Sequence, residues 1–329
     1  MTLVIGVDEA GYGPNLGPLV IGLSAWRVGP PRPRPSRPLL ELPGVASDSS
    51  AEANSTGAST AVAQGPPKVE LAKLNLYRLL RRYVTAVPDG VRLAIADSKL
   101  LYKPGGGLDL LAEGVLAVDP DARRHFDEQR AGQIDLECDE LAPATTLRCQ
   151  LGERARPLPL AARMIFPAEF NRLVTEHGTK GTLLSHATLG LVRDLVGNQQ
   201  ARHVRVTCDK HGGRNHYGEL LATFFPAATI EPLVESRKVS RYRLVDEGRT
   251  IELAFRAKGE ALLETALASM TAKYLRELAM QAFNRFWQRH IPDLKPTAGY
   301  PNDARRFFES IKPVCRELGL VEDQVWRSR

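Results

Sequence analysis

Runs of apolar residues along the chain predict a set of β-strands. The first run, residues 3–7, is followed by a glycine-rich turn at residues 11–18 and by a second apolar run that reads as a paired strand. The last run alternates Ile251, Leu253 and Phe255 with other residues, which is the pattern of a strand with one covered face. The runs that we expect to form strands are residues 3–7, 19–28, 93–96, 203–207 and 250–256.

Helical spacing of apolar residues marks three further segments. The first has Leu71, Leu74 and Leu79 at helical spacing ahead of a basic Arg81-Arg82 pair. On the second, residues 182–196, one face that should pack on a sheet carries Leu184, Ala187, Leu191 and Leu195. On the third, an apolar stripe that keeps period for several turns consists of Leu263, Leu267, Met270, Tyr274 and Leu278. The C-terminal part is therefore predicted to be helical and to dock on the same core.

Two stretches interrupt these patterns. Residues 29–67 are rich in Pro, Ser, Ala and Gly and cannot bury enough apolar surface to order themselves, so we interpret them as a low-complexity, disordered insertion. Residues 104–159 have mixed polarity and few clear periods, and they read as a second insertion within the domain. We therefore expect one domain, formed by residues 1–28 and 68–329 and interrupted by these two insertions.

Composition narrows the class of protein. Lys and Arg outnumber Asp and Glu by 44 to 38, and the resulting formal charge of +6 suits a polyanionic partner, although basic solubility alone gives the same balance. The four cysteines show no C-x-x-C pair, so neither a disulfide framework nor a zinc site is expected. The chain opens without a basic leader and has no membrane-length apolar stretch, so we expect a cytoplasmic protein without membrane attachment.

Carboxylates recur at one kind of position, just after a predicted strand. Asp8 and Glu9 follow the first strand, Asp209 ends another, and Glu260 comes shortly after residues 250–256. Ligand sites in α/β sheets favour that edge. Acids gathered there repel one another by about 4 kcal/mol per pair at about 4 Å with an effective dielectric constant near 20, so a protein keeps such a cluster where cations neutralise it. Oxygen ligands of this kind suit Mg²⁺ or Mn²⁺.

A simpler interpretation of each acid is a solvated turn residue or a helix cap. Taken alone, Asp209 and Glu260 favour that interpretation. The adjacent pair Asp8-Glu9 favours function, because two acids between a buried run and a glycine turn have no obvious packing or capping role.

The glycine-rich turn at residues 11–17 (GYGPNLG) does not match a dinucleotide-binding loop. That loop needs G-x-G-x-x-G running into a helix, whereas here Pro14 and Pro18 flank the third glycine and a strand follows. The glycines instead allow the backbone to approach a sugar or phosphate closely.

These residues resemble the type 2 ribonucleases H, the family of ribonucleases HII and HIII, in motifs that follow the family's order over nearly the whole chain. At the N-terminal end, the matches are residues 6–13 (GVDEAGYG) with Gly17-Pro18 behind them, similar to G-x-D-E-x-G-R-G-x-x-x-G-P, and residues 97–100 (DSKL), similar to D-S-K-x-L. In the C-terminal half, they are residues 208–210 (CDK) at a strand end, 258–260 (KGE) with 268–273 (ASMTAK), 298–301 (AGYP) and 326–328 (WRS).

The resemblance implies a ribonuclease H-like α/β fold: a mixed five-stranded sheet flanked by helices, with a helical C-terminal extension. It implies that Asp8, Glu9, Asp209 and Glu260 are the metal-binding and catalytic acids, with Mg²⁺ or Mn²⁺ as cofactor. Asp97 is not among them and is interpreted as a structural or substrate-side residue. The implied activity is an endoribonuclease that cuts the RNA strand of RNA–DNA hybrids and leaves 5′-phosphate and 3′-hydroxyl ends. Its partner would be such a hybrid or a duplex DNA containing a ribonucleotide, and we expect a monomer.

The candidate substrate-binding residues come from several segments. Backbone amides of Gly11 and Gly13 would face the ribose, and Lys99 and Arg214 are candidate phosphate contacts. Tyr300 is a candidate for stacking on a sugar, with a buried core tyrosine as the alternative. Tyr12 completes the set, which is Gly11, Tyr12, Gly13, Lys99, Arg214 and Tyr300. A basic stretch, residues 237–243 (RKVSRYR), suits backbone phosphates almost as well as it suits a solvated strand face.

The chain departs from the family's pattern at three places. Tyr12 replaces the arginine of G-R-G, which puts recognition of a single ribonucleotide in doubt but does not exclude hybrid cleavage. The fourth acid is Glu, and the spacing after Glu260 is one residue short, which makes Glu264 a fallback for that position. Thr297-Ala298 stands where Asn-Lys is expected. These departures also permit a catalytically degenerate nucleic-acid-binding protein of the same fold; a junction resolvase is a further alternative, disfavoured by Gly299-Tyr300.

Overall fold

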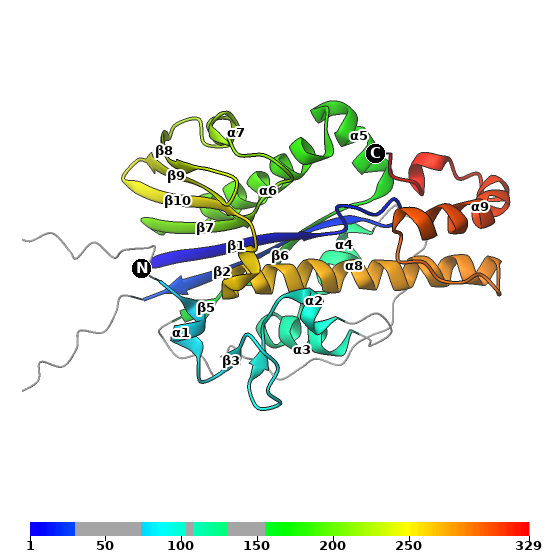
Figure 1. Ribbon diagram of the computed structural model, residues 1–329, viewed down its shortest axis with the longest axis horizontal. Helices are drawn as coiled ribbons and strands as arrows, with labels where there is room; N and C mark the ends of the chain where they lie inside the picture. The colour runs from blue at the N-terminus through cyan, green and yellow to red at the C-terminus, as the bar shows by residue number, and fades with distance from the viewer. Residues whose placement is uncertain (30–73, 103–107, 131–154, 329) are drawn as a thin grey trace, which may run out of the picture.

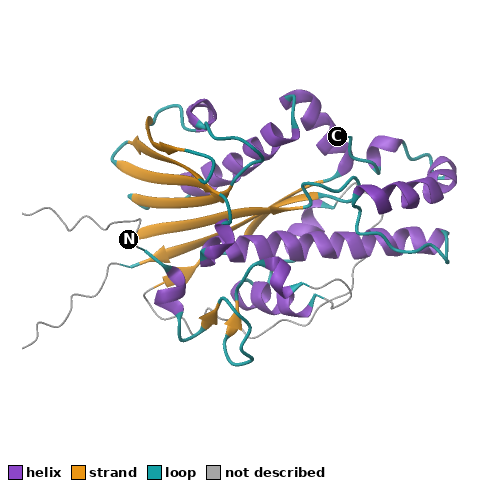
Figure 2. Ribbon diagram, viewed as in Figure 1, coloured by secondary structure: helices purple, strands orange, loops and turns teal. Residues whose placement is uncertain are grey.

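The computed structural model describes residues 1–29, 74–102, 108–130 and 155–328, which form a central sheet with helices on both faces (Figures 1 and 2). The sheet has eight strands in the order β5-β2-β1-β7-β10-β9-β8, with β6 also paired to β2. The strands are β1 Thr2–Ala10, β2 Leu19–Val28, β5 Ala155–Pro157, β6 Ala161–Ile165, β7 His203–Asp209, β8 Thr229–Glu235, β9 Val239–Asp246 and β10 Arg249–Arg256. A small parallel pair lies apart from it, β3 Val84–Thr85 and β4 Leu93–Ala94.

The fold class predicted from the sequence is confirmed, and the sheet is larger than expected. Strand β1 pairs antiparallel with β2 and parallel with β7, and β7 pairs parallel with β10, so the sheet is mixed. Five central strands, β6-β2-β1-β7-β10, are extended by β5 at one edge and by β9 and β8 at the other. The sheet therefore exceeds the five strands that the resemblance implied. The hairpin of β8 and β9 was not found among the apolar runs, because it carries polar and charged residues and gives only a weak apolar signal.

Nine helices of four or more residues flank the sheet in the described part of the chain. On one face lie α1 Leu76–Leu80, α2 Ser98–Leu101, α3 Asp109–Val118, α4 Arg124–Gln129 and the long α8 Leu263–His290. On the other face lie α5 Pro167–His177, α6 Lys180–Gly197 and α7 Gly218–Phe224. Helix α9 Pro301–Glu317 follows α8, and short 3-10 turns are η3 Gly259–Ala261 and η4 Glu322–Gln324. The expected helical C-terminal extension is thus present.

Two apolar cores, one on each face, explain the unbroken apolar run of β1. Leu3, Ile5 and Val7 face the core beneath α5, α6 and α7, whereas Val4 faces the core beneath α8. A strand that is buried on both sides is apolar at every position, whereas a strand exposed on one side alternates. Strand β10 alternates as predicted: Ile251, Leu253 and Phe255 are buried, while the residues between them are half-buried.

Two glycines let α8 pack directly on the middle of the sheet. A Cβ atom on Gly6 would lie 2.1 Å from the backbone carbon of Glu264, and one on Gly22 would lie 2.3 Å from the carbonyl oxygen of Ala268. The hydroxyl of Ser24 donates a 2.6 Å hydrogen bond to the Glu264 carbonyl oxygen in the same contact. This close approach fixes the start of α8, and with it η3, at the edge of the sheet where β1 and β7 end.

The remaining predictions for single segments are confirmed with corrected bounds. The stripe on α8 is buried throughout, and on α6 Leu184 and Ala187 are buried. On α6 the face is rotated from the predicted one, because Val192 and Val196 are buried while Leu191 and Leu195 are only half-buried. The helix predicted from Leu71 is described only over α1, and the strand predicted at residues 93–96 covers only the two residues of β4.

The structure describes different fractions of the two segments that we interpreted as insertions. Apart from Gly29, residues 29–67 lie outside the described residues. Within residues 104–159, the helices α3 and α4 and the strand β5 are described and contribute buried side chains to the core beneath α8. The division of the chain into a domain and two insertions remains a prediction.

The structure describes two of the four cysteines, and the length and hydrophobicity of its helices bear on whether any could span a membrane. Cys208 and Cys315 are buried free thiols, and Cys138 and Cys149 lie outside the described residues. Among the helices described here, none is both long and apolar enough to cross a bilayer.

Candidate active site

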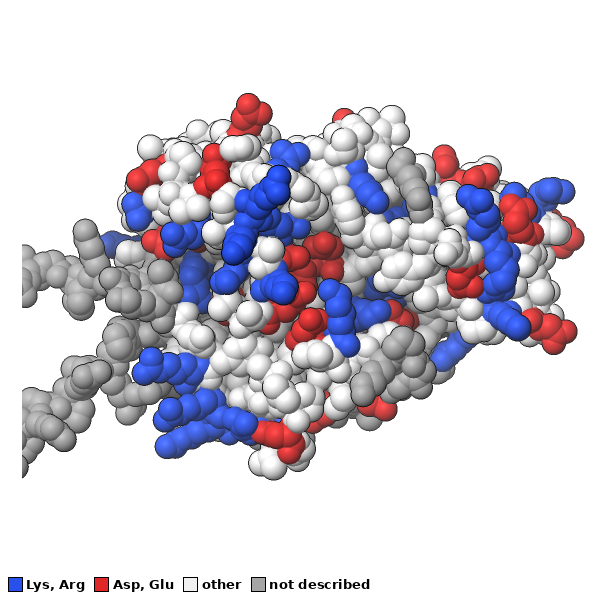
Figure 3. All heavy atoms as spheres, viewed as in Figure 1, with Lys and Arg blue, Asp and Glu red and all other residues white. Residues whose placement is uncertain are grey.

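The sheet brings four acids to one edge. In the parallel pair of β1 and β7, Val7 lies beside Cys208, so the next residues, Asp8 and Asp209, leave neighbouring strand ends at the same level. Strand β10 pairs Arg256 with Asp209 and leads within a few residues to Glu260 in η3. Glu9 follows Asp8 near the end of β1. On the face viewed in Figure 3, Asp and Glu atoms gather near the middle of the molecule and are bordered by Lys and Arg atoms.

Burial and the charges of neighbouring carboxylates both raise the pKa values of these acids. Burial, with the neighbouring charges of Glu9, Asp209 and Glu260, raises the pKa of Asp8 well above its usual range, and a hydrogen bond from Ser269 lowers it in part. Burial raises the pKa of Glu9 from near 4.5 to about 8, helped by the charges of Asp209 and Glu260. The pKa of Asp209 is raised by burial and then by Glu260. At neutral pH the site therefore favours uptake of protons or cations.

The donor chemistry of these acids fits a hard divalent cation. Among the described residues, no three His, Cys, Asp or Glu side chains converge closely enough to hold a metal ion. The four candidate ligands are all carboxylates, which suit Mg²⁺ and Mn²⁺ rather than softer metals. The nearby His211 hydrogen-bonds Ser185 through its Nδ1 atom at 3.0 Å, and burial lowers its pKa to about 3. His211 is therefore a neutral, buried residue.

Two serine hydroxyl groups connect Asp8 with helix α2. The Ser98 and Ser269 hydroxyls lie 3.1 Å apart, and Ser269 hydrogen-bonds the Asp8 carboxylate. Asp97 caps helix α2 by accepting a 2.9 Å hydrogen bond from the Lys99 amide, which agrees with its interpretation as a structural residue. The segment at residues 97–100 therefore acts on the site through Ser98, a role that sequence reasoning did not assign to Ser98 or Ser269.

Lys99 and Glu264 occupy different surroundings. The Lys99 ammonium is exposed and lies 4.0 Å from a Glu260 carboxylate oxygen, at the open side of the acid cluster. Glu264 is fully buried and makes a 2.6 Å ion pair with Arg205 on β7. The charges that raise the pKa values of Asp8, Glu9 and Asp209 include Glu260 and do not include Glu264. The geometry therefore places Glu260, not the fallback Glu264, with the other acids.

The glycine loop between β1 and β2 rests on two buried arginines. Gly11 has φ +83°, and a Cβ atom there would lie 2.5 Å from the Nε atom of Arg276 on α8. Its carbonyl oxygen accepts a 2.6 Å hydrogen bond from Arg327, whose guanidinium also stacks 3.9 Å above the Phe170 ring. Burial and then the charge of Arg276 lower the pKa of Arg327 to about 9. Arg327 in the C-terminal segment thus holds the glycine loop in place. No sequence pattern had indicated that Arg276 on α8 would contact the same loop.

Tyr12 and Gly13 form the outer part of the loop. Gly13 is exposed, and a Cβ atom there would have no neighbour within 4 Å. The half-buried Tyr12 ring lies under the ammonium group of Lys180, which is 4.7 Å from the ring centroid. The Tyr12 side chain therefore faces Lys180 at the start of α6. It brings no positive charge to the acids, as an arginine at this position would.

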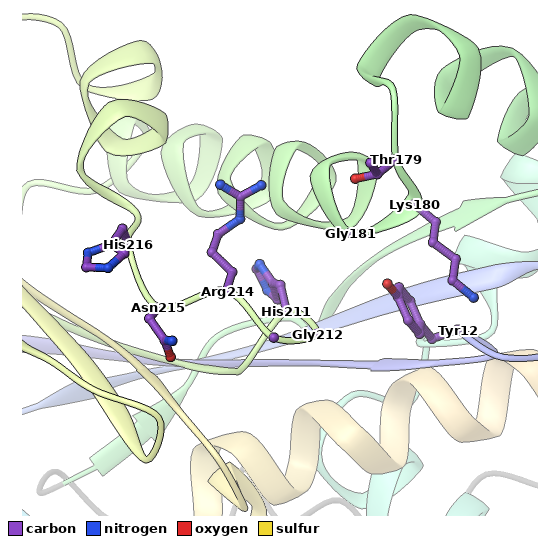
Figure 4. Close-up of a pocket in the computed structure, with 10 residues that line it drawn as sticks. Tyr12, Thr179, Lys180, Gly181, His211, Gly212, Arg214, Asn215 and His216 are labelled. Atoms are coloured by element: carbon purple, nitrogen blue, oxygen red, sulfur yellow. The ribbon is translucent and has the colours of Figure 1, made fainter.

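Arg214 lines a pocket of about 580 Å³ beside this loop (Figure 4). Tyr12 and Lys180 stand on one side of it and Arg214 and His216 on the other, with Gly212 between them (Figure 4). The Arg214 guanidinium donates a 3.3 Å hydrogen bond to the Thr182 hydroxyl at the start of α6. The pocket brings together two cations that are far apart in the sequence, and Lys180 was not singled out beforehand.

Tyr300 lies at the surface, at the N-terminal cap of α9. Its side chain is 54% exposed, so the alternative of a buried core tyrosine was wrong. It lies close enough to Arg276 to influence the pKa of that arginine. The carbonyl oxygen of the preceding Gly299 accepts a 2.8 Å hydrogen bond from the Asn15 amide, so Tyr300 is tied to the glycine loop.

Solved structures of ribonucleases HII and HIII are similar to this chain. RNase HII of Archaeoglobus fulgidus, from its complex with PCNA, is 14% identical with a TM-score of 0.43, over 99% of this chain and 94% of that chain. Ribonuclease H2 of Pyrococcus horikoshii OT3 is 14% identical with a TM-score of 0.44, over 98% and 92% of the two chains. RNase H3 of Aquifex aeolicus has the same identity and TM-score, over 98% of this chain and 71% of that one.

The proteins in these structures carry the names of the family whose motifs the sequence resembles. No protein-family model matches the chain, and no curated protein sequence matches it. At 14% identity the likeness assigns neither an activity nor a role to any residue. We therefore infer function from the side chains of this chain alone.

Proposed function

We propose that this protein is a divalent-metal-dependent endoribonuclease that cuts the RNA strand of RNA–DNA hybrids. The observation that carries the proposal is the gathering of Asp8, Glu9, Asp209 and Glu260 at one edge of the sheet. Burial, and then the charges of neighbouring acids, raise the pKa of Asp8, Glu9 and Asp209 there. A buried group of like charges is costly, and a requirement for bound cations explains why a protein would keep it. The cations proposed are Mg²⁺ or Mn²⁺.

In the proposed reaction, water attacks the phosphorus atom of an RNA phosphodiester and the bond to the 3′ oxygen breaks. The products are a 5′-phosphate and a 3′-hydroxyl, whose oxygen takes up a proton. Bound Mg²⁺ or Mn²⁺ would activate the water and stabilise the leaving oxygen. Asp8 and Asp209 would supply the central oxygen donors, and Glu9 and Glu260 would complete them and orient the water. Ser269 keeps Asp8 in place through its hydrogen bond.

Substrate recognition is proposed to depend on the sugar and the backbone. Backbone amides of Gly11 and Gly13 would meet the 2′-hydroxyl, the group that distinguishes RNA from DNA. Lys99 and Arg214 would contact phosphates, and the exposed ring of Tyr300 would stack on a sugar. Because Tyr12 packs under Lys180, we propose that the enzyme prefers a hybrid to a single ribonucleotide in duplex DNA. We also propose that it acts as a monomer in the cytoplasm.

The alternative from another class is a nucleic-acid-binding protein that keeps the fold without activity. The absence of three convergent ligands among the described side chains favours this alternative. The group of four neighbouring acids argues against this alternative, because a protein that only binds polyanions gains nothing from carboxylates in its binding surface.

One experiment separates the two. The protein and an Asp8→Asn variant are incubated with a labelled RNA–DNA hybrid and with a DNA duplex carrying one ribonucleotide, each in Mn²⁺, Mg²⁺ or EDTA. We expect cutting of the hybrid that requires the metal and is lost in the variant. Binding without cutting by the unaltered protein would support the non-catalytic alternative, and equal cutting of both substrates would contradict the preference assigned to Tyr12.

A further inference from the structure

Among the described residues, no helix covers the α8 face of β8, β9 and β10. Helix α8 covers β1 and β2, and no residue of β8, β9 or β10 takes part in the described core beneath it. The opposite face of the same strands is buried, with Tyr242, Leu244 and Ile251 in the other core. In Figure 1, α8 runs along β1 and β2 and not along β9 and β10. The α8 face of β9 and β10 is therefore open among the described residues, and at Arg256, opposite Asp209, it reaches the edge where the acids lie.

This open surface is rich in arginine. It contains a depression of about 560 Å³ whose charged lining residues are Arg205, Arg241, Arg243, Glu252 and Arg256. Two of these cations are neutralised: Arg205 pairs with Glu264 at 2.6 Å, and Arg243 pairs with Glu231 at 2.9 Å. Two arginines, Arg241 and Arg256, then remain against one carboxylate, Glu252, so the surface carries an excess of positive charge.

The guanidinium groups of Arg241 and Arg256 make no hydrogen bond and no ion pair with any residue that the structure describes. The charge of Arg256 lowers the pKa of Glu264, whose carboxylate is bound by Arg205. Arg241 is exposed and Arg256 is half-buried. A structural role would give each of these cations a bonded partner, and neither has one among the described residues.

The register of the sheet brings the two unpaired cations together and places them next to the acids. Arg241 lies opposite Ala254, two residues before Arg256 on the same face, so the two arginines are diagonal neighbours across β9 and β10. Arg256 in turn lies opposite Asp209 in the parallel pair of β10 and β7. Two like charges lie side by side there, and neither makes an ion pair with a described residue, which suits a ligand that brings negative charge.

We propose that Arg241 and Arg256 form a seat for the phosphodiester backbone of the nucleic acid beside the bond that is cut. This inference rests on the proposed function and adds the surface along which the duplex is held. The guanidinium group matches phosphate geometry with paired donors, and the seat offsets the repulsion between the substrate and the carboxylates at the adjacent edge. Binding by this surface is independent of base sequence, because phosphates carry none.

The test is hybrid binding by variants in an Asp8→Asn background, measured by fluorescence anisotropy in Mg²⁺ at salt concentrations from roughly 50 to 200 mM. Each of Arg241→Gln and Arg256→Gln should weaken binding about 5–10-fold near 0.1 M salt and reduce the slope of log affinity against log salt by about 0.9. Arg256→Lys keeps a point charge and should retain most of the slope. Circular dichroism spectra check that each variant is folded.

Arg243→Gln is the matched control, because Arg243 lies on β9 on the same face but is already paired with Glu231. It changes the net charge by the same amount and should alter the slope by less than half as much. Equal losses in all three glutamine variants would mean a general effect of charge and would overturn the seat. Unchanged binding in Arg241→Gln and Arg256→Gln, or no hybrid binding by the Asp8→Asn parent, would overturn it as well. Cleavage by the unaltered protein is assayed separately, so failure of the nuclease proposal would be seen on its own.

Discussion

Replacing Glu9 by Gln should stabilise the protein in the absence of divalent cations. Burial and the charges of Asp209 and Glu260 raise the pKa of Glu9 from near 4.5 to about 8 in the folded state. In the unfolded chain the group ionises at its ordinary value, so the folded state loses stability as the pH rises from about 4.5 towards 8. The substitution removes the charge and, with it, this loss.

The magnitude follows from the two pKa values. At pH 7 the ionisation penalty is at most about 3 kcal/mol, since each pKa unit corresponds to roughly 1.4 kcal/mol. Glu9 is partly exposed, so solvent screening lowers this value, and we expect Glu9→Gln to gain about 1–3 kcal/mol at pH 7–8. In a chain of this size the melting temperature would rise on the order of 5 °C. At pH 4.5 the gain should nearly vanish, because Glu9 is then protonated in the folded state.

The assay is thermal unfolding in EDTA and in excess Mn²⁺, at pH 4.5, 6 and 8. Manganese should stabilise the unaltered protein at pH 8 and stabilise Glu9→Gln less, so that the two melting temperatures converge. Glu264→Gln is the matched control, because Glu264 is paired with Arg205 and its replacement leaves a buried arginine unpaired, which should destabilise the protein at pH 8 by about 3–5 kcal/mol. A Glu9→Gln variant that is less stable than the parent at pH 8 in EDTA would refute the electrostatic account of the site.

Three further substitutions test the packing around the site. Arg327→Ala removes the donor to the Gly11 carbonyl oxygen and should cost about 2–3 kcal/mol in urea unfolding, together with a loss of hybrid binding; normal stability would contradict the support assigned to the C-terminal segment. Gly22→Ala places a Cβ 2.3 Å from an α8 carbonyl oxygen and should cost at least about 1–3 kcal/mol, whereas Gly197→Ala in open space should cost nothing. Tyr12→Arg should raise cutting at a single ribonucleotide relative to the hybrid, and an unchanged ratio in a two-substrate assay would show that residue 12 does not set the preference.

The sequence by itself determined the elements with a strong local signal. Strand β2 was predicted to the residue, and the alternation of β10 and the stripe of α8 were predicted correctly, because burial on one or both faces leaves a direct record in apolar spacing. The hairpin of β8 and β9 was missed, since one of its faces is open and its residues are mixed in polarity. On α6, Leu191 and Leu195 pack against the core only at its margin, since Val192 and Val196 take the fully buried positions of the last turns.

The candidate site divides in the same way. Asp8, Glu9, Asp209 and Glu260 were found from the sequence because each follows a strand that is itself predictable. Only the tertiary structure decided between Glu260 and Glu264, since the choice depends on which side of α8 meets Arg205. The hydroxyl pair of Ser98 and Ser269, the arginines under the glycine loop and the unpaired cations of the open sheet face are contacts between distant segments. Such contacts depend on strand register and on close packing across the sheet. The spacing of apolar residues along the chain does not predict either.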